Sequence, residues 1–375
     1  MSRIASNLGG VIDAMWGKMM LQGDANALRC CLALSQKIRG IMAAFPKDVP
    51  VISSHPIVGN MAVACGFKNV INLIFDNYPQ YFVLVPGAIN LVQSPSYFDK
   101  LLDMGCPSSS LRLAGHWVSR LVEDRTFLTF AARLSRLEKK LPRRFLIAVG
   151  GAGAQRAFLE GLLQGIRIYL NCGDHGHIAD AVSAKLQALS LDWTEVTTNE
   201  GTVELCKKEA LAKLEEPADW KAGRLSVSAS AVTLFRFDSH FAAFRCTDLV
   251  IRMVDVLVTK PSELAFFPVP KLHIRRVGAH EAHSAVRAQE LGDGTVECRE
   301  VSHAVSKLHQ LIEPDSALFR LMNDCIIKAA ETNVYDGSKV ACEIAFGLNE
   351  KTAEKTGKKT ELIPKEAKEK VLVAA

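Results

Sequence analysis

The feature that most constrains the fold of this chain is an alternation of short apolar runs with helical segments. Two of these runs, residues 49–53 and 70–75, are mostly β-branched or aliphatic, and a polar, proline-containing loop follows each of them. Strands that are apolar throughout are typical of parallel sheets covered by helices on both faces. The alternation therefore predicts an α/β fold, in which residues 81–85 and 91–92 continue the sheet.

A second unit of the same kind begins at residue 145. Residues 145–149 read as a strand, residues 150–153 as a glycine-rich turn and residues 155–163 as a helix. This order is typical of the opening unit of a nucleotide-binding fold. Right-handed crossovers would place the later strands in one doubly wound parallel sheet. We expect those strands at residues 167–170, 194–197, 227–235, 255–258, 272–277 and 295–298.

The length of the chain, 375 residues, exceeds what one hydrophobic core usually serves, so we expect two Rossmann-like domains. A charged helical segment followed by Pro142 separates the two sets of strands and reads as a connection. The predicted organisation is a first domain at 1–120, a linker at 121–143, a second domain at 144–325, a C-terminal helix at 326–348 and a lysine-rich tail at 349–375.

Composition excludes several classes of partner and location. The formal net charge of +5 is dispersed along the chain, and no nucleic-acid recognition motif is present, so we expect no nucleic-acid partner. No apolar run approaches about 20 residues, and the N-terminus lacks the pattern of a signal peptide. We therefore expect a cytoplasmic protein, and any membrane contact, at the inner face, would be peripheral.

The glycine-rich turn is the first of three segments that could bind a ligand. Gly150, Gly151 and Gly153 let the backbone turn tightly after a strand and approach a ligand closely. The following helix, which starts near Gln155 and Arg156, offers unpaired N–H groups and a guanidinium group to a phosphate. Such a turn also occurs for packing alone, so the motif leaves both interpretations open.

A second segment follows the strand expected at 255–258. Lys260 and Ser262 flank Pro261, a residue that suits the first turn of a helix, and Glu263 comes next. A carboxylate at the carboxyl end of a strand can accept hydrogen bonds from both hydroxyls of a ribose. The alternative is that Glu263 only complements the helix dipole.

The third segment is the loop that contains Gly278, His280 and Glu281, again between a strand and a helix. In a parallel sheet this loop would lie beside the previous two. His280 and His283 have a spacing that does not place both on one face of a helix, so we expect no metal site.

Together these segments resemble the donor-binding domain of the glycosyltransferase B family that includes monogalactosyldiacylglycerol synthase and the peptidoglycan N-acetylglucosaminyltransferase. The similar segments are GGAGAQ, MVDVLVTKPSELAFFPVPKL and GAHEAHSA followed by ELGDGT, within residues 145–312. The resemblance implies that Gly151 and Gly153 meet the diphosphate of a nucleotide sugar, that Glu263 binds the ribose, and that His280 and Glu281 contact the donor sugar and phosphates. It implies no cofactor beyond the donor, which we expect to be a UDP-sugar.

Residues 48–120 resemble the acceptor domain of the same family more weakly, through HPIV, the segment ending in FDNYP, and LAGHWV. Asp76 is the candidate general base, because deprotonating an acceptor hydroxyl needs a carboxylate or imidazole within reach. His55 and His116 are further candidates. Turn formation by Asp76 and loop hydrogen bonding by the histidines are the alternatives. Domains of this family begin with a strand that the sequence here lacks.

We therefore expect a glycosyltransferase that moves a sugar from a nucleoside diphosphate to a lipid or other hydroxyl acceptor. One alternative is a nucleotide-sugar epimerase on the same fold, which would need several acidic and basic side chains around the sugar. A second alternative is a non-catalytic protein that binds nucleotide sugars or acts as a scaffold.

Overall fold

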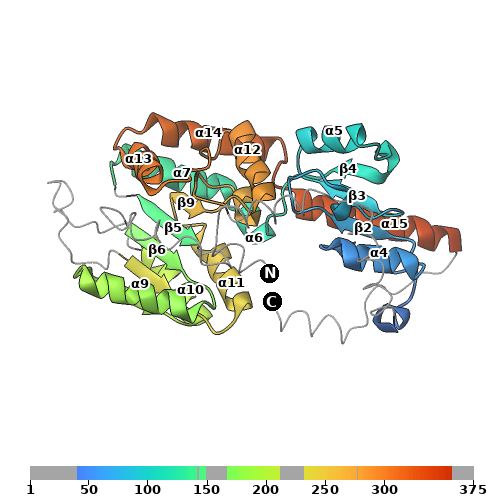
Figure 1. The fold of residues 1–375 in the computed structure, drawn as a ribbon, viewed down its shortest axis with the longest axis horizontal. Helices are drawn as coiled ribbons and strands as arrows, with labels where there is room; N and C mark the ends of the chain where they lie inside the picture. Colours follow the sequence, from blue (N-terminus) through green and yellow to red (C-terminus); the bar gives the residue numbers. More distant parts are fainter. Residues whose placement is uncertain (1–39, 142, 149–166, 212–231, 277, 357–375) are drawn as a thin grey trace.

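The computed structural model describes residues 40–141, 143–148, 167–211, 232–276 and 278–356. Each of two α/β domains is built on a parallel sheet, one of four strands and one of six (Figure 1). The predicted fold class, two Rossmann-like α/β domains, is confirmed. The predicted glycine turn and its helix lie outside the described residues, as does the segment before residue 40, where the first strand is expected to be missing.

The first domain has the strand order β1-β2-β3-β4, and all neighbouring strands are parallel. Its elements are β1 (Val51–Ser53), α4 (Pro56–Ala64), β2 (Val70–Leu73), η1 (Tyr81–Val83), β3 (Ile89–Val92), α5 (Pro95–Asp103), η2 (Ser108–Ser110) and β4 (Leu111–Leu113). Helices α4 and α5 both begin with proline, whose missing N–H costs nothing in a first turn. The predicted strands at 49–53 and 70–75 are confirmed in shortened form.

The prediction of a strand at residues 81–85 is wrong. Two buried asparagines, Asn72 and Asn90, hold this segment as a 3₁₀ turn and a loop. Asn72 Nδ2 donates to the carbonyl oxygen of Val83 at 2.8 Å and to Asn90 Oδ1 at 2.9 Å, and Val85 N donates to the same Oδ1 at 2.9 Å. Side chains therefore satisfy the backbone groups that a neighbouring strand would otherwise pair.

The second domain has the strand order β10-β9-β5-β6-β8-β7, again parallel throughout. The strands are β5 (Arg144–Ala148), β6 (Arg167–Asn171), β7 (Trp193–Val196), β8 (Val232–Phe235), β9 (Val256–Thr259) and β10 (Lys271–His273). No strand forms at 295–298, where the prediction is wrong. His273 N donates to the hydroxyl of Thr295 instead of a backbone oxygen, so the segment pairs with β10 and Ile274 through the isolated bridges Lys271–Gly294 and Ile274–Cys298. The other predicted strands are confirmed with shifted ends where they are described.

Helices cover both faces of the second sheet. One face packs against α7 (Thr126–Glu138), α9 (Gly176–Ala188), α13 (Val301–Ile312) and the first half of α14 (Ala317–Glu331). The other face packs against α11 (His240–Val250), with α10 (Asn199–Leu211) beside it. The remaining elements are α6 (Arg120–Glu123), η5 (Glu263–Phe266), η6 (Ala279–Glu281) and α12 (Ala282–Leu291).

The chain returns to the first domain at its C-terminal end. Helix α15 (Gly337–Thr356) lies beside β2 and β3 (Figure 1), where Ala341 and Ala345 pack with Ile71 and Leu91. The predicted single helix from 326 to 348 is therefore two helices, α14 and α15, separated by residues 332–336. Helix α15 also extends into the region expected to be a lysine-rich tail.

The two chain segments that connect the domains pair with each other. His116 N donates to Val334 O at 2.6 Å, Gly337 N donates to His116 O at 3.1 Å, and Trp117 and Asp336 form an antiparallel bridge. A Cβ on Gly115, whose φ is +93°, would lie 2.5 Å from Val334 O. Glycine at 115 is therefore required by both backbone conformation and space.

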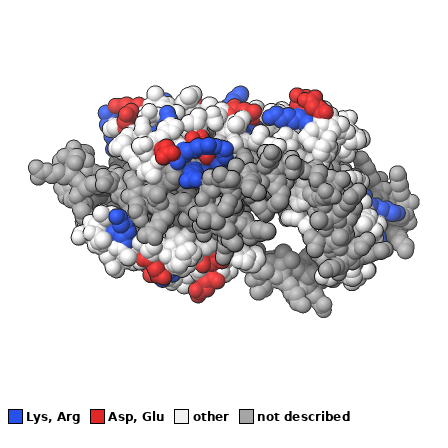
Figure 2. All heavy atoms as spheres, viewed as in Figure 1, with Lys and Arg blue, Asp and Glu red and all other residues white. Residues whose placement is uncertain are grey.

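Within the part of the chain that the structure describes, no helix combines the length and apolar character needed to cross a membrane. On the face drawn in Figure 2, Lys and Arg side chains are interspersed with Asp and Glu on the described surface. The charge of this face is mixed, as the dispersed net charge of the sequence suggests.

The substitution Gly115→Ala tests the crossing of the two connecting segments. We expect it to lower the free energy of unfolding by about 1–3 kcal/mol more than an alanine in the same left-handed conformation would without a clash. The extra loss arises because the methyl group must displace backbone atoms. Gly66→Ala is the matched control, because Gly66 has a φ of +84° and an added Cβ there would meet nothing within 4 Å. Urea denaturation of both variants measures the difference, and equal losses would contradict the packing argument.

Candidate functional site

The loop after β2 carries Asp76 and is held from two sides. Gln93 Nε2 donates to the carbonyl oxygens of Ile74 at 3.0 Å and Phe75 at 2.8 Å. Trp117 Nε1 donates to the same Ile74 oxygen at 3.0 Å. These contacts come from the end of β3 and from the connection between the domains, so they fix Asp76 relative to both.

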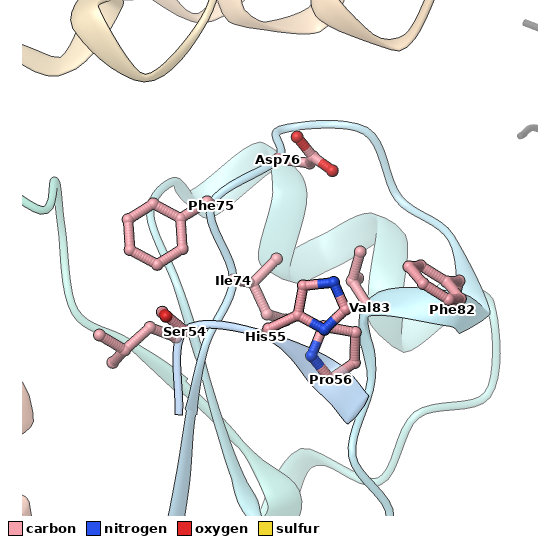
Figure 3. A pocket seen from close by; sticks show the side chains of 9 residues that line it. Ser54, His55, Pro56, Ile74, Phe75, Asp76, Phe82 and Val83 are labelled. Carbon is pink, nitrogen blue, oxygen red and sulfur yellow. The ribbon is translucent and has the colours of Figure 1, made fainter. Parts of the chain in front are cut away.

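A pocket of about 360 Å³ lies at the carboxyl ends of β1 and β2. His55, Asp76 and Phe82 are among its lining residues, so two of the three predicted catalytic residues share one pocket (Figure 3). His55 is the N-cap of α4, and its Nδ1 accepts a hydrogen bond from Ile57 N at 3.2 Å. Its ring meets that of Phe82 edge-on with centroids 6.3 Å apart. His55 Nε2 is the ring nitrogen that this cap leaves for a ligand.

Residues next to Asp76 contact the second domain directly. Asn77 Nδ2 donates to Ser284 Oγ at 3.3 Å, and the Tyr78 ring lies edge-on to the His283 ring with centroids 4.8 Å apart. Ser284 and His283 belong to the first turn of α12, directly after His280 and Glu281. The structure thus brings the Asp76 loop of one domain against the predicted donor loop of the other.

The loops after β9 and β10 lie side by side, as the sequence predicts. The Lys260 ammonium group forms an ion pair with a carboxylate oxygen of Glu281, and both side chains are largely buried. The second carboxylate oxygen of Glu281 accepts a hydrogen bond from Gly278 N at 3.3 Å. One carboxylate therefore ties together residues from both predicted donor segments.

The remaining predicted donor residues fall into two groups. Ser262 is buried, with its hydroxyl 3.4 Å from Lys260 O, and His280 has a buried Nδ1 without a hydrogen-bond partner among the described residues. Glu263 opens η5, which packs against α12, so its backbone stands at the predicted position. Gly150, Gly151, Gly153, Gln155 and Arg156 lie outside the described residues.

His116 occupies a different environment from Asp76 and His55. It is fully buried between the domains, where Nδ1–H donates to Phe266 O at 3.2 Å and Nε2 accepts from Arg287 Nε at 3.4 Å. Burial first, and then the positive charges of Arg287 and Lys271, hold the pKa of His116 well below its usual value. The neutral imidazole therefore acts as a hydrogen-bonded bridge at the domain junction, and it does not line the pocket of Asp76.

A buried ionic group beside His116 has no counterpart in the sequence predictions. Lys271 Nζ donates to Asp293 Oδ2 at 2.5 Å, and Tyr335 Oη lies 3.4 Å from the same oxygen. Both charged side chains are fully buried. The only sequence signal is the placement of Asp293 between two glycines, because Lys271 lies just before the strand expected at 272–277 and carries no motif. The group joins β10 to the segment that leads into α15.

Within the described ranges, no three His, Cys, Asp or Glu side chains cluster in a way that could hold a metal ion.

Stability is expected to depend on pH through His273, which is fully buried. Its Nδ1–H donates to Thr295 O at 3.0 Å, and burial lowers its pKa to about 4. As pH falls below about 6.5, the unfolded chain takes up this proton while the folded chain does not, so stability is lost. Between pH 7.5 and pH 5 this amounts to about 2 kcal/mol.

His273→Asn removes the titrating ring and keeps an N–H donor. Urea denaturation at pH 7.5 and pH 5 should therefore show a loss of stability that is smaller by about 2 kcal/mol in this variant than in the unsubstituted protein. The same loss in both proteins would contradict the assignment of a buried neutral imidazole.

Two family models match parts of the sequence. A family model described as "Domain of unknown function (DUF6938)" matches residues 106–346, and one described as "Domain of unknown function (DUF6937)" matches residues 23–100. No curated protein sequence matches the chain.

Several solved structures are similar at low identity. UDP-GlcNAc 2-epimerase from Neisseria meningitidis, bound to UDP-GlcNAc, is 10% identical with a TM-score of 0.48 and covers 86% of this chain and 82% of its own. MnaA of S. aureus with UDP is 12% identical with a TM-score of 0.49, and the match covers 85% of this chain and 79% of MnaA. HepE of Anabaena with UDP and glucose is 12% identical with a TM-score of 0.42, and the match covers 84% of this chain and 81% of HepE.

None of these three is named as monogalactosyldiacylglycerol synthase or as the peptidoglycan N-acetylglucosaminyltransferase, so the resemblance at that level stays a prediction. The family model, in contrast, spans well over half of the chain, including the whole described sheet of the second domain and the return to the first. The chain belongs to the family described as domain of unknown function DUF6938.

Proposed function

We propose that this protein binds a nucleoside-diphosphate sugar between its two domains and transfers the sugar to a hydroxyl acceptor held by the first domain. The observation that carries this proposal is the contact of the Asp76 loop with the first turn of α12, through the Asn77–Ser284 hydrogen bond and the Tyr78–His283 ring contact. A transferase needs donor and acceptor side by side, and this contact juxtaposes the two predicted sites.

The strand order of the second sheet supports a donor site beside β5 and β9. From β5 the chain runs to β6, β7 and β8 on one side, and then crosses to β9 and β10 on the other. In open parallel sheets, ligands bind outside the carboxyl ends of the strands at the point where the order reverses. The segments that follow β5 and β9 in the chain are the glycine-rich stretch and the segment that begins with Lys260, and both contain predicted donor-binding residues.

The charges at this point suit a diphosphate leaving group. As the bond from the anomeric carbon to the diphosphate breaks, the leaving oxygen takes the electron pair and negative charge builds up on it. The Lys260 ammonium group stands at the end of β9, where it can stabilise that charge. Glu281 holds Lys260 in place before the donor arrives.

The pocket of the first domain suits an acceptor. Its volume of about 360 Å³ lies within the range that holds a small molecule. Apolar walls from Pro56, Ile74 and Phe82 would bind the body of an acceptor, which could be a lipid, and Asp76 would accept the proton of its hydroxyl as the oxygen attacks the anomeric carbon. His55 would hydrogen-bond the acceptor through Nε2.

Epimerisation of a nucleotide sugar is the second candidate, and a specific observation favours it. Lys260, His280, Glu281 and His283 gather at the junction, and burial first, then the nearby positive charges, lower the pKa of His283. An acidic and a basic group on opposite sides of a sugar could remove and return a proton without any acceptor. A non-catalytic nucleotide-sugar-binding protein would keep the donor site alone.

Calorimetric titration with UDP, GDP, ADP and their sugars tests the donor site. We expect one nucleotide to bind saturably, and Lys260→Gln and Glu263→Ala each to weaken it by roughly 10–100-fold, because each removes a charged hydrogen-bonding partner. Lys328→Gln is the control, since that side chain is 76% exposed on α14. A variant is scored only if its thermal melting shows a folded protein. Binding that neither site variant weakens would overturn the donor-site assignment.

Incubation of the bound sugar nucleotide then separates the reactions. Release of nucleoside diphosphate that depends on an added hydroxyl acceptor, and that Asp76→Asn suppresses, supports transfer. An epimerised donor in the absence of acceptor supports the second candidate. Saturable binding with neither product supports the binding protein and contradicts both reactions.

A further inference from the structure

A second pocket, of about 210 Å³, lies at the opposite end of the second sheet from the proposed donor site. It opens at the amino ends of β5 and β9, where Arg144 begins one strand and Asp255 precedes the other. Helices α7 and α11 cover opposite faces of the sheet (Figure 1). Residues of α7 and of the end of α11 provide further walls of the pocket. No part of the proposed transfer reaction uses this pocket.

Arginine dominates the charged lining of this pocket. Four guanidinium groups, those of Arg133, Arg136, Arg144 and Arg252, share it with one carboxylate, that of Asp255. Asp255 Oδ2 is engaged within the wall, where it accepts from Arg136 Nε at 3.1 Å and from Arg144 N at 2.8 Å. One oxygen of the only acidic residue in the described lining is thus committed to two donors, while Asp255 Oδ1 is buried without a described hydrogen-bond partner.

Arg133 is charged and desolvated at the inner wall. It is 2% exposed, and its described hydrogen bonds go to neutral oxygens, Asn323 Oδ1 at 2.6 Å and Pro268 O at 3.5 Å. Burial lowers the pKa of Arg133 to about 10, which still leaves it protonated at neutral pH. A buried guanidinium group without a carboxylate in hydrogen-bond contact is costly unless an anion joins it.

Arg252, in the turn after α11, is half-buried and brings a further guanidinium group to the lining. Its Nε is buried and has no hydrogen-bond partner within the described residues. Its positive charge lowers the pKa of Asp248, although burial of that carboxylate outweighs this and raises the pKa. Arg252 therefore has a buried donor without a described acceptor, in the lining of a pocket that the buried Arg133 also lines.

We propose that this pocket binds a phosphate group of a small anion. Guanidinium groups recognise phosphate through paired, charge-assisted hydrogen bonds, and several of them converge here. The volume is below the range that holds drug-sized ligands, so it suits inorganic phosphate, pyrophosphate or a short phosphorylated compound and excludes a whole nucleotide sugar. The proposal is independent of the proposed transferase activity, because it concerns the other end of the sheet.

Calorimetric titration with inorganic phosphate and pyrophosphate at low ionic strength tests this site. Each titration is run with and without excess UDP, so that binding at the proposed donor site is recognised by competition. We expect saturable binding that UDP does not abolish and that Arg252→Gln weakens at least 10-fold. Arg252→Lys keeps the positive charge but loses the paired N–H donors of the guanidinium group. Its affinity for phosphate should therefore lie between those of the unsubstituted protein and Arg252→Gln.

Arg320→Gln is the matched control, because this arginine is exposed on α14. An equal loss in Arg320→Gln and Arg252→Gln would show that net charge alone attracts the anion, and it would overturn the proposal. So would binding that UDP abolishes completely, binding that Arg252→Gln leaves unchanged, or the absence of saturable binding in the unsubstituted protein.

Discussion

The arrangement of the two domains depends on the pairing of the two segments that connect them. Gly115 and His116 lead out of the first domain, and Val334 to Gly337 lead back into it, with backbone hydrogen bonds of 2.6 and 3.1 Å between them. A side chain at position 115 or 337 would clash with backbone atoms of the opposite segment. The crossing thus acts as one paired element rather than two independent linkers, and it sets which loops of the two domains meet.

Buried polar groups reinforce this crossing from the side of the second domain. His116 bridges Phe266 O and Arg287, and Arg287 lies 3.5 Å from Glu290, which accepts a hydrogen bond from Ser96 of the first domain at 3.1 Å. His116 and Arg287 are buried and would be costly to bury without their partners, whereas the contact of Glu290 with Ser96 is exposed. The buried pair therefore favours one relative placement of the domains. That placement is what brings Asp76 and α12 together. The role predicted for His116 is accordingly better described as positioning.

Local pattern was sufficient for much of this architecture. The apolar runs of β5 and β9 and the order of the segments after them predict the adjacent Lys260 and Glu281 loops, because parallel strands place successive loops at one edge. The strand expected at 81–85 does not form because two buried asparagines, one on β2 and one on β3, satisfy its backbone groups. Lys271, Asp293 and the arginine pocket were missed for a similar reason: charged residues in apolar surroundings reveal their partners only when the chain is folded. The return of α15 to the first sheet likewise leaves no periodic signal.

Hydrogen–deuterium exchange during titration with the sugar nucleotide that binds tests the central claim most directly, because the claim concerns one site made by two domains. The account predicts slower exchange in peptides covering residues 256–267 and 278–291 and in peptides covering residues 72–85. The protection of all three should depend on ligand concentration in the same way. Peptides from α13 should be unchanged. Protection confined to one domain, or none at saturation, would contradict a shared site between the domains.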